Sequence, residues 1–411
     1  MASTVDPQSG YGVAFLDWLG CASAGSRERA PQALRSLGVE LPARVAFAGA
    51  AGHVLDYDDT LPDGVAHVSA PCAPAALMVA DELGLSLAAM LEAFAEGWEA
   101  MAAVAAASHP ALYDGGWHPT AVCGPVGAAM AAGHLLDLSA QEREYAVALA
   151  LLRTGGTRGA FGSDGKAIQV GLAAAAGVQA ALLARAGAVP DARVISGEVG
   201  FEQVLGAVVP PGVADGAGAD NGTRAIDRNW IKLHPSCLGT HAPIDAAAQA
   251  RDGGFVADGA SILVAVHPVA RQAAHLDDVG DGLEAKFSIP YCVSHALRYG
   301  PPGVADFSAL DADTRERAAL VRVVVDESLP DFGTVLSADG RELARVGCPQ
   351  GAPERPASAA DLAAKLSDLT GERLDGVLDD LDAPATRALD AAGLRAIPVG
   401  RLRATAVGER R

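Results

Sequence analysis

The sequence has no long apolar run and few cysteines, and each shortage excludes a class of protein. Half of its 411 residues are hydrophobic, yet no uninterrupted apolar run reaches the roughly 18 residues that a membrane-spanning helix needs. The six cysteines include no Cys-x-x-Cys pair, which argues against a zinc site and a disulfide framework. The first residues carry neither the basic nor the apolar segment of a secretory signal. We therefore expect a soluble protein of the reducing cytoplasm, without a metal ion.

Positive charge is also scarce. Thirty-one Lys and Arg residues stand against fifty Asp and Glu residues, so the formal net charge is −19. This charge repels nucleic acid and anionic membranes, and no basic stripe offsets it, so neither partner is expected. An acidic substrate would have to be held by a few cations inside a pocket. Isolated lysines in polar, glycine-rich stretches are therefore candidate site residues.

Alanine, with leucine, valine and methionine at helical spacing, dominates the chain from Gly10 to about Leu205. This periodicity predicts helices at Ala46–Leu55, Ala75–Leu83, Leu87–Ala107, Ala121–Leu136, Ala140–Leu152 and Val170–Ala186. Strands do not alternate with these helices, and no Gly-x-Gly-x-x-Gly follows a strand, so a dinucleotide-binding fold is not indicated. Small side chains let helices approach closely, and we expect an all-helical bundle.

The sequence changes character after residues 208–227, whose Pro, Gly, Ala and Asp content indicates a linker or a loose surface loop. Strand-like stretches and a hairpin follow at Ser261–His267, Arg322–Glu327 and Gly333–Arg345. Helical patterns recur at Asp245–Arg251, Tyr291–Tyr299, Asp311–Leu320, Ala359–Leu366 and Thr386–Leu394. We expect a mainly α protein of two domains: a large all-helical bundle of residues 1–228, completed by residues 360–411, and a smaller α+β lid of residues 229–359.

The densest polar stretch, residues 52–67, holds four aspartates and two histidines. Crowded carboxylates repel one another when ionised, so a fold keeps them together mainly where cations, hydrogen bonds or a bound ligand offset the cost. On a helix that ends near Thr60 and Pro62, Asp56 and Thr60 would share one face and could bind one ligand. A charged helix end in solvent is the alternative.

Three further polar stretches each place, at the start of an expected helix, one residue that can transfer a proton or bind an anion. His118 follows flexible glycines, where an imidazole can act as acid or base. Lys166 opens a helix, and a lysine at a helix N-terminus forms an anion site suited to a carboxylate. Tyr291 could give or take a proton. Each also has a structural interpretation: a hydrogen-bonded histidine, a first-turn lysine and a half-buried tyrosine at a domain seam.

A fourth stretch contains four potentially catalytic or ligand-binding side chains within ten residues. It lies at the junction of the two expected domains, where ligand sites tend to lie. These residues are Lys232, His234, Cys237 and His241. Their spacing matches no zinc pattern, and nothing marks the Cys237 thiol as an activated nucleophile. We therefore expect neither a metal ion nor a covalent cysteine intermediate here.

Taken together and in this order, these stretches resemble the motifs of the MmgE/PrpD family. The likeness is carried mainly by His53-Val-Leu-Asp-Tyr-Asp-Asp-Thr60 and Gly116-Trp-His-Pro-Thr120, with support from Gly97-Trp-Glu99, Ile231-Lys232 and Ala285–Val293. The resemblance covers most of the chain. It implies a helical domain, an α+β lid, a pocket between them, a homodimer, and neither a metal nor an organic cofactor. The family includes dehydratases, decarboxylases and epimerases of small carboxylic acids.

The resemblance also implies roles for particular residues. The family's acidic motif corresponds to Asp56 and Thr60, and its two motif histidines correspond to His67 and His118. Its two substrate-facing lysines correspond to Lys166 and Lys232, and its lid tyrosine corresponds to Tyr291. The sequence departs from the family pattern in several places. His67 lies about one residue further from the acidic motif and is followed by Val-Ser where proline is usual. Cys237 stands where some members have histidine, and His234 replaces an aromatic residue.

We therefore expect a cofactor-independent lyase, a dehydratase or a decarboxylase, that acts on a small di- or tricarboxylic acid. Lys166 and Lys232 would bind carboxylates, and His118, with Asp56 as its neighbour, would transfer a proton at the reacting carbon. His67 or Tyr291 would protonate the leaving hydroxyl or the opposite face. The remaining expected substrate contacts are Thr60, Cys237, His234 and His241. An epimerase or isomerase on the same site, and a binding protein without turnover, are the alternatives.

Overall fold

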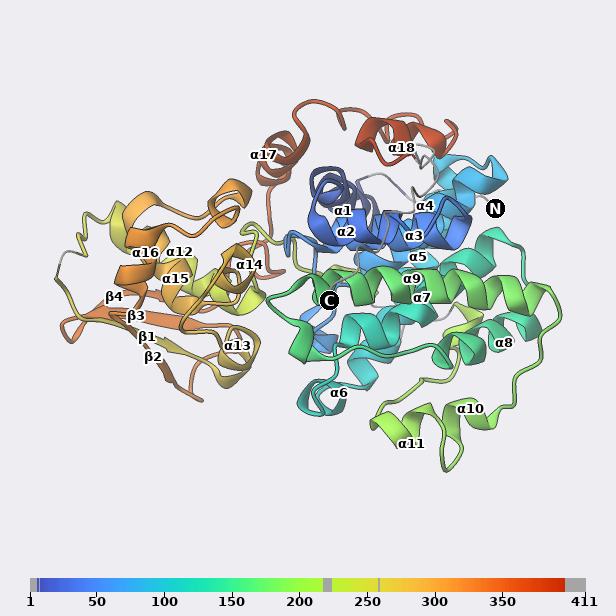
Figure 1. Ribbon diagram of the computed structural model, residues 1–411, viewed down its shortest axis with the longest axis horizontal. Coiled ribbons are helices and arrows are strands. Elements are labelled where there is room, and N and C mark those ends of the chain that lie inside the picture. The colour runs from blue at the N-terminus through green and yellow to red at the C-terminus, as the bar shows by residue number, and fades with distance from the viewer. Residues whose placement is uncertain (1–5, 7, 217–223, 258, 396–411) are drawn as a thin grey trace, which may run out of the picture.

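The computed structural model describes residue 6 and residues 8–216, 224–257 and 259–395. Long helices dominate it, and one small sheet lies at the opposite end of the molecule from most of them (Figure 1). The expectation of a mainly α protein is confirmed. The last part of the expected C-terminal completion, residues 396–411, lies outside the described residues.

The helical body is organised around two long helices, α7 (Pro119–Leu135) and α9 (Asp164–Arg185), which pack against each other. Around them lie α1 (Gly10–Gly25), α2 (Arg29–Arg35), α3 (Leu41–His53), α4 (Ser69–Leu83), α5 (Leu87–Ala107), α6 (Ala111–Asp114), α8 (Ala140–Leu151), α10 (Arg193–Ser196) and α11 (Phe201–Leu205). Small residues make this packing possible, because a Cβ added to Gly97 of α5 would collide with the Gly127 carbonyl oxygen of α7. By length and composition α9 could cross a membrane, but most of it is buried against α3 and α7, as in the core helix of a globular domain.

The second body contains a four-stranded sheet in the order β2-β1-β3-β4. Strand β1 (Ile262–Val266) runs parallel to β2 (Val321–Val325) and antiparallel to β3 (Thr334–Ala338), which pairs with β4 (Arg341–Val346). Buried and half-buried residues alternate along β1, as expected for a strand with one face on a core. The helices of this body are α12 (His241–Asp252), α13 (Pro268–Ala273), α14 (Gly282–Ala285), α15 (Ile289–Tyr299) and α16 (Ala312–Ala318).

Apolar side chains form two separate large cores. One contains buried residues from Tyr11 to Ile226 together with Leu374 to Leu394, and the other runs from Trp230 to Ala352. The C-terminal helices α17 (Ala359–Thr370) and α18 (Thr386–Ala392) contact α1 (Figure 1). The chain therefore leaves the helical body once, builds the sheet-containing body, and returns.

Two local expectations are wrong. Helix α3 ends at His53 rather than at Leu55, and Asp56 takes a left-handed conformation with a φ of 52°, so Asp56 and Thr60 share no helical face. The end of the stretch 208–227 is no loose loop, because the buried amides of Ala225 and Ile226 donate to the Glu99 carboxylate. Residues 217–223 of that stretch lie outside the described residues.

Several helices begin earlier than their apolar patterns predict. Among them are α4, α7 and α9, which start at Ser69, Pro119 and Asp164. A first helical turn accepts proline and acidic residues, because its amide groups have no partner within the helix. The apolar periodicity therefore appears only one or more residues into each helix.

Candidate active site

All four lysines of the chain are buried. Lysine is almost never fully buried unless its charge is paired, and the cost of removing an ammonium group from water is several kcal/mol. The four residues come from distant parts of the chain: Lys166 from the first turn of α9, Lys232 from the junction between the bodies, Lys286 from the segment before α15, and Lys365 from α17. Their hydrogen bonds therefore show where the fold concentrates positive charge.

Two of these ammonium groups share the Asp56 carboxylate. Asp56 Oδ1 lies 2.9 Å from Lys166 Nζ and 2.8 Å from Lys232 Nζ. Burial alone would raise the pKa of Asp56, but the two lysines together hold it well below its usual value. Two cations facing one anion leave an excess of one positive charge in a buried place. This arrangement suits the binding of a further carboxylate.

The backbone of the same segment is held by three different lysines. Lys286 Nζ donates to the Leu55 carbonyl oxygen at 2.7 Å, and Lys232 Nζ donates to that of Asp56 at 2.6 Å. Lys365 Nζ donates to the next carbonyl oxygen, Tyr57, at 2.6 Å. Three consecutive carbonyl groups are thus fixed by side chains from the junction, the second body and the C-terminal tail. This clamp maintains the left-handed turn that presents Asp56.

Three imidazoles lie beside the acidic segment. The His53 ring centroid is 4.6 Å from that of His67 and 5.7 Å from that of His118. Asp58 Oδ2 lies 2.8 Å from His53 Nδ1 and 3.2 Å from His67 Nδ1. Burial lowers the pKa of His53 to about 4 and that of His118 well below its usual value. His53 and His118 are therefore neutral at neutral pH.

The ligand-type atoms of His53, Asp58 and His67 all lie within 4.8 Å of one another, a spacing that could hold a metal ion. The Asp58 carboxylate already faces an Nδ1 atom of each ring at hydrogen-bonding distance. Hydrogen bonding therefore accounts for this cluster, and an ion is not needed to offset the Asp58 charge. A site without metal remains our prediction.

A small cavity of about 40 Å³ lies where the two bodies meet. Its polar lining consists of Asp56, Thr60, His67, Tyr113, His118, Lys166 and Cys237, and its apolar lining includes Phe161, Phe287 and Phe332. The rings of Phe161, from the helical body, and Phe287, from the other body, are 5.5 Å apart. This space has room for a few water molecules at most. A polycarboxylate can enter only if side chains or one of the bodies move.

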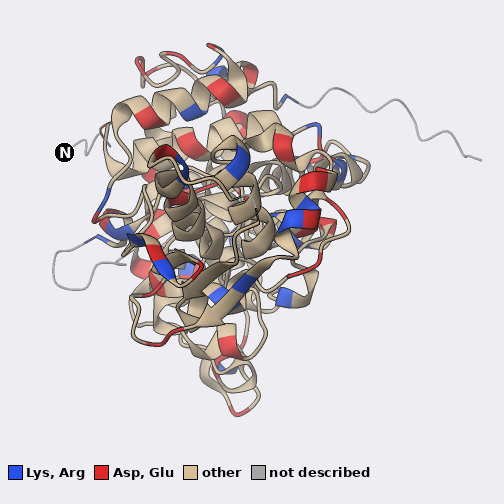
Figure 2. Cartoon of the chain, turned by 90° about the vertical axis from the view of Figure 1, so that its left-hand side faces the viewer, with Lys and Arg blue, Asp and Glu red and all other residues tan. Residues whose placement is uncertain are grey.

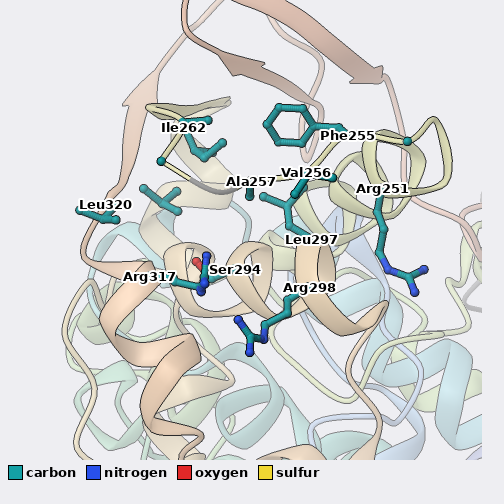
Figure 3. A pocket seen from close by; sticks show the side chains of 14 residues that line it. Arg251, Phe255, Val256, Ala257, Ile262, Ser294, Leu297, Arg298, Arg317 and Leu320 are labelled. Carbon is teal, nitrogen blue, oxygen red and sulfur yellow. The ribbon is translucent and has the colours of Figure 1, made fainter.

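A larger hollow of about 470 Å³ opens beside α15 (Figure 3). Apolar side chains such as Phe255 and Leu297 line it together with Arg251, Arg298 and Arg317. None of the expected site residues borders it. Perturbed, buried ionisable groups mark functional sites better than size does, so the smaller cavity is the candidate active site.

Six of the ten expected site residues line this cavity: Asp56, Thr60, His67, His118, Lys166 and Cys237. Thr60 reaches it from a backbone bridge with Trp230 rather than from a helix. Lys232 lies behind Asp56 with a completely buried side chain. His118 and its expected neighbour Asp56 both line the cavity. The hydrogen-bonding contacts of the two residues differ, since His118 Nδ1 lies 2.6 Å from Gln169 Nε2 and the two lysines hold the Asp56 carboxylate.

The other three expected residues do not border the cavity. The Tyr291 hydroxyl is turned into its own body, where it accepts a hydrogen bond of 3.0 Å from the Asp311 amide. The rings of His234 and His241 lie together, with centroids 5.0 Å apart, and His234 Nε2 is 2.8 Å from Asp245 Oδ1. These residues belong to the packing around the site in this conformation.

Sequence reasoning missed Asp58, Gln169, Lys286 and Lys365 as site residues. Gln169 carries no signal in its surroundings that distinguishes it from other polar residues of a long helix. The two lysines could have been found from their rarity. The sequence has only four lysines in 411 residues, whereas most proteins have many solvated ones.

Comparisons with known proteins cover both bodies. The MmgE/PrpD N-terminal domain matches residues 11–211, and the MmgE/PrpD C-terminal domain matches residues 234–390. A cis-aconitate decarboxylase of Homo sapiens is 30% identical over 228 residues, which are 51% of this chain and 44% of that protein. The match thus spans less than half of that relative's length. Since the two domain models together account for most of the sequence, the chain belongs to the MmgE/PrpD family.

Proposed function

We propose that this protein is a cofactor-independent lyase, a dehydratase or a decarboxylase, acting on a small di- or tricarboxylic acid. One observation carries the proposal: two buried ammonium groups share a single carboxylate beside a cavity that two imidazoles line. The family and the similarity to a cis-aconitate decarboxylase support a lyase reaction. A homodimer in the cytoplasm, without a metal or an organic cofactor, is part of the proposal.

The charges suit the intermediate of such a reaction. A substrate carboxylate next to Lys166 would form a charge-assisted hydrogen bond, which contributes about 1.5–3 kcal/mol. Breaking a C–H or C–carboxylate bond beside another carboxylate places enolate-like negative charge on its oxygens. Lys166, which borders the cavity, and Lys232, which lies behind Asp56, both favour that charge, because charges interact more strongly in a buried site than in water.

The same intermediate has more than one outcome. It can expel a neighbouring hydroxyl group as water, or receive a proton on the other face. Two imidazoles, His67 and His118, border the cavity, and a pair of proton-transferring groups also suits an epimerase or isomerase of a related dicarboxylic acid. That reaction is the second candidate.

Product analysis tests these alternatives. The purified protein would be incubated in deuterated buffer with citrate, 2-methylcitrate, cis-aconitate and iminodisuccinate, and the products identified by NMR and mass spectrometry. A lyase yields a product that has lost water or carbon dioxide. Deuterium in the recovered acid without either loss indicates an epimerase. Binding of an acid without any turnover would overturn both proposals. His118→Ala, purified identically, controls for contaminating enzymes.

A further inference from the structure

We propose that Gln169 and Asp58 hold the two cavity imidazoles in opposite tautomers, so that His118 presents an N–H group and His67 presents a lone pair. Both are positioning residues, since neither borders the cavity. The assignment itself follows from hydrogen-bond partners. Its consequence for turnover rests on the proposed function.

The backbone of Thr157 fixes the orientation of the Gln169 side-chain amide. The Thr157 N–H can only donate, and it donates to Gln169 Oε1 at 3.1 Å. Gln169 Nε2 donates in turn to the Thr157 carbonyl oxygen at 3.3 Å. A flipped amide would place donor against donor and acceptor against acceptor. The Gln169 oxygen and nitrogen are therefore distinguishable by their partners.

This orientation determines the tautomer of His118. Gln169 Nε2 lies 2.6 Å from His118 Nδ1, and an amide NH₂ group can only donate. His118 Nδ1 must accept, so the single proton of the neutral ring is on Nε2. Burial, together with nearby His53 and Lys166, lowers the pKa of His118, which keeps the ring neutral. His118 can therefore donate a hydrogen bond to a developing oxyanion, but it cannot take a proton there.

The partners of His67 dictate the reverse arrangement. Its Nδ1 faces two atoms of Asp58, the carboxylate Oδ2 and the backbone carbonyl oxygen, each at 3.2 Å. Both are acceptors, so Nδ1 carries a proton. Nε2 lies 3.8 Å from Asp56 Oδ1, beyond hydrogen-bonding distance, and when the ring carries a single proton the lone pair is on this nitrogen. The backbone that carries the ring is held by Thr120, whose Oγ1 accepts a hydrogen bond from the His67 amide at 3.0 Å. His53 Nδ1 donates to the same Asp58 oxygen at 2.8 Å.

These assignments divide the chemistry between the two rings. His67 Nε2 takes the proton from the carbon next to a carboxylate, and the electron pair of the broken C–H bond moves onto the carboxylate oxygens. The His118 N–H group and Lys166 stabilise that charge, and Asp58 stabilises the imidazolium formed at His67. The ionisable groups that surround the two rings are Asp56, Asp58, Lys166 and His53.

Nitrogen NMR of protein labelled with ¹⁵N-histidine tests the assignment directly. Spectra between pH 6 and 8 are expected to show His118 protonated on Nε2 only and His53 protonated on Nδ1 only. His67 is expected to carry a proton on Nδ1, and its single-proton form is expected to carry none on Nε2. His118→Gln and His67→Gln identify the signals by their loss. A proton on His118 Nδ1 in the wild-type protein would overturn the proposal.

Gln169→Glu provides a second test, with Gln179→Glu on the same helix as the matched control. A carboxylate at position 169 would draw a proton onto His118 Nδ1. We expect the two His118 nitrogen signals to exchange character and kcat to fall about 100-fold or more, as for removal of an oxyanion donor. The Gln179 variant should keep kcat within about twofold and the wild-type tautomer, since Gln179 contacts Arg153. Wild-type His118 signals with unchanged kcat in the Gln169 variant would contradict the inference.

The two proposals fail separately. If none of the acids is converted but the nitrogen signals are as expected, the lyase proposal is wrong and the tautomers stand. If an acid is converted but His118 carries its proton on Nδ1, the tautomer inference is wrong and the lyase proposal stands.

Discussion

Lys232 shows how a residue can influence the site without lining the cavity. Within the part of the chain that the structure describes, its ammonium group donates hydrogen bonds to Asp56 alone, at the carboxylate and the carbonyl oxygen. Removal of one partner of a buried pair costs about 3–5 kcal/mol, and removal of a group that stabilises transition-state charge lowers kcat about 100-fold or more. We expect Lys232→Met to show both effects, measured by denaturant unfolding and steady-state kinetics.

Lys286→Met is the matched control for that variant. Lys286 is also buried, but among the described residues its Nζ donates only to the carbonyl oxygens of Leu55 and Pro235. Its loss should lower stability while kcat falls less than about tenfold, because no carboxylate loses its partner. A Lys232 variant with the kcat of the wild-type protein would contradict the role of shared charge.

Asp59 predicts a pH dependence of stability. Burial and the nearby Asp17 raise the pKa of Asp59 to about 8, against 3.8 in the unfolded chain. Between these values the folded protein keeps a proton that the unfolded chain has lost, so stability falls as the pH rises from about 4 to 8. Asp59→Asn removes this proton. Between pH 5 and pH 8, the Tm of this variant should fall less than that of the wild-type protein. The difference should be at least about 2–4 °C, which corresponds to roughly 1 kcal/mol in the free energy of unfolding.

Asp63→Asn controls for the loss of a carboxylate from the same segment. Asp63 is only partly buried and pairs with Arg228, so its removal should leave the slope of Tm against pH unchanged. Parallel pH profiles for the wild-type protein and the Asp59 variant would exclude the proposed proton.

At the scale of elements, helix α17 supports a site from which it is far removed in sequence. Lys365 donates to the Tyr57 and Lys232 carbonyl oxygens, and its Nζ lies 2.6 Å from Asp17 Oδ1 of α1. Burial alone would lower the pKa of Lys365, but Asp17 helps to raise it above its usual value. The tail is therefore an integral part of the clamp on the acidic segment.

Lys365→Met and Asp17→Asn are each expected to destabilise the protein by about 3–5 kcal/mol, because each leaves a buried group without its partner. The double variant should lose less than the sum, since the uncompensated charge is then absent. Urea unfolding of the four proteins measures the coupling. Additive losses would show that the pair does not act as a unit.

At the scale of the whole molecule, charge predicts how salt affects substrate capture. Acidic and basic residues are interspersed along the chain in the view of Figure 2, but the net charge of −19 opposes the approach of a polycarboxylate. Raising the ionic strength from about 0.01 to 0.15 M shortens the Debye length from about 30 to 8 Å and screens this repulsion. We expect kcat/KM to rise while kcat stays nearly constant. A fall in kcat/KM over this range would mean that local attraction at the cavity outweighs the overall charge.

The sequence by itself determined the mainly α character, the position of the sheet-forming region and the family. These properties follow from local patterns, because the apolar periodicity of a helix or strand repeats within a few residues. The motif residues Asp56, His67 and His118 were recognisable for a similar reason, since their neighbours along the chain identify them.

Only the tertiary structure decided which groups meet. That Lys166 and Lys232 share Asp56, that Gln169 rather than Asp56 contacts His118, and that Tyr291 turns away from the cavity depend on contacts between distant segments. A buried charge or lone pair takes whichever partner the packing brings within about 3 Å. That choice is made by the fold as a whole, and no local pattern records it.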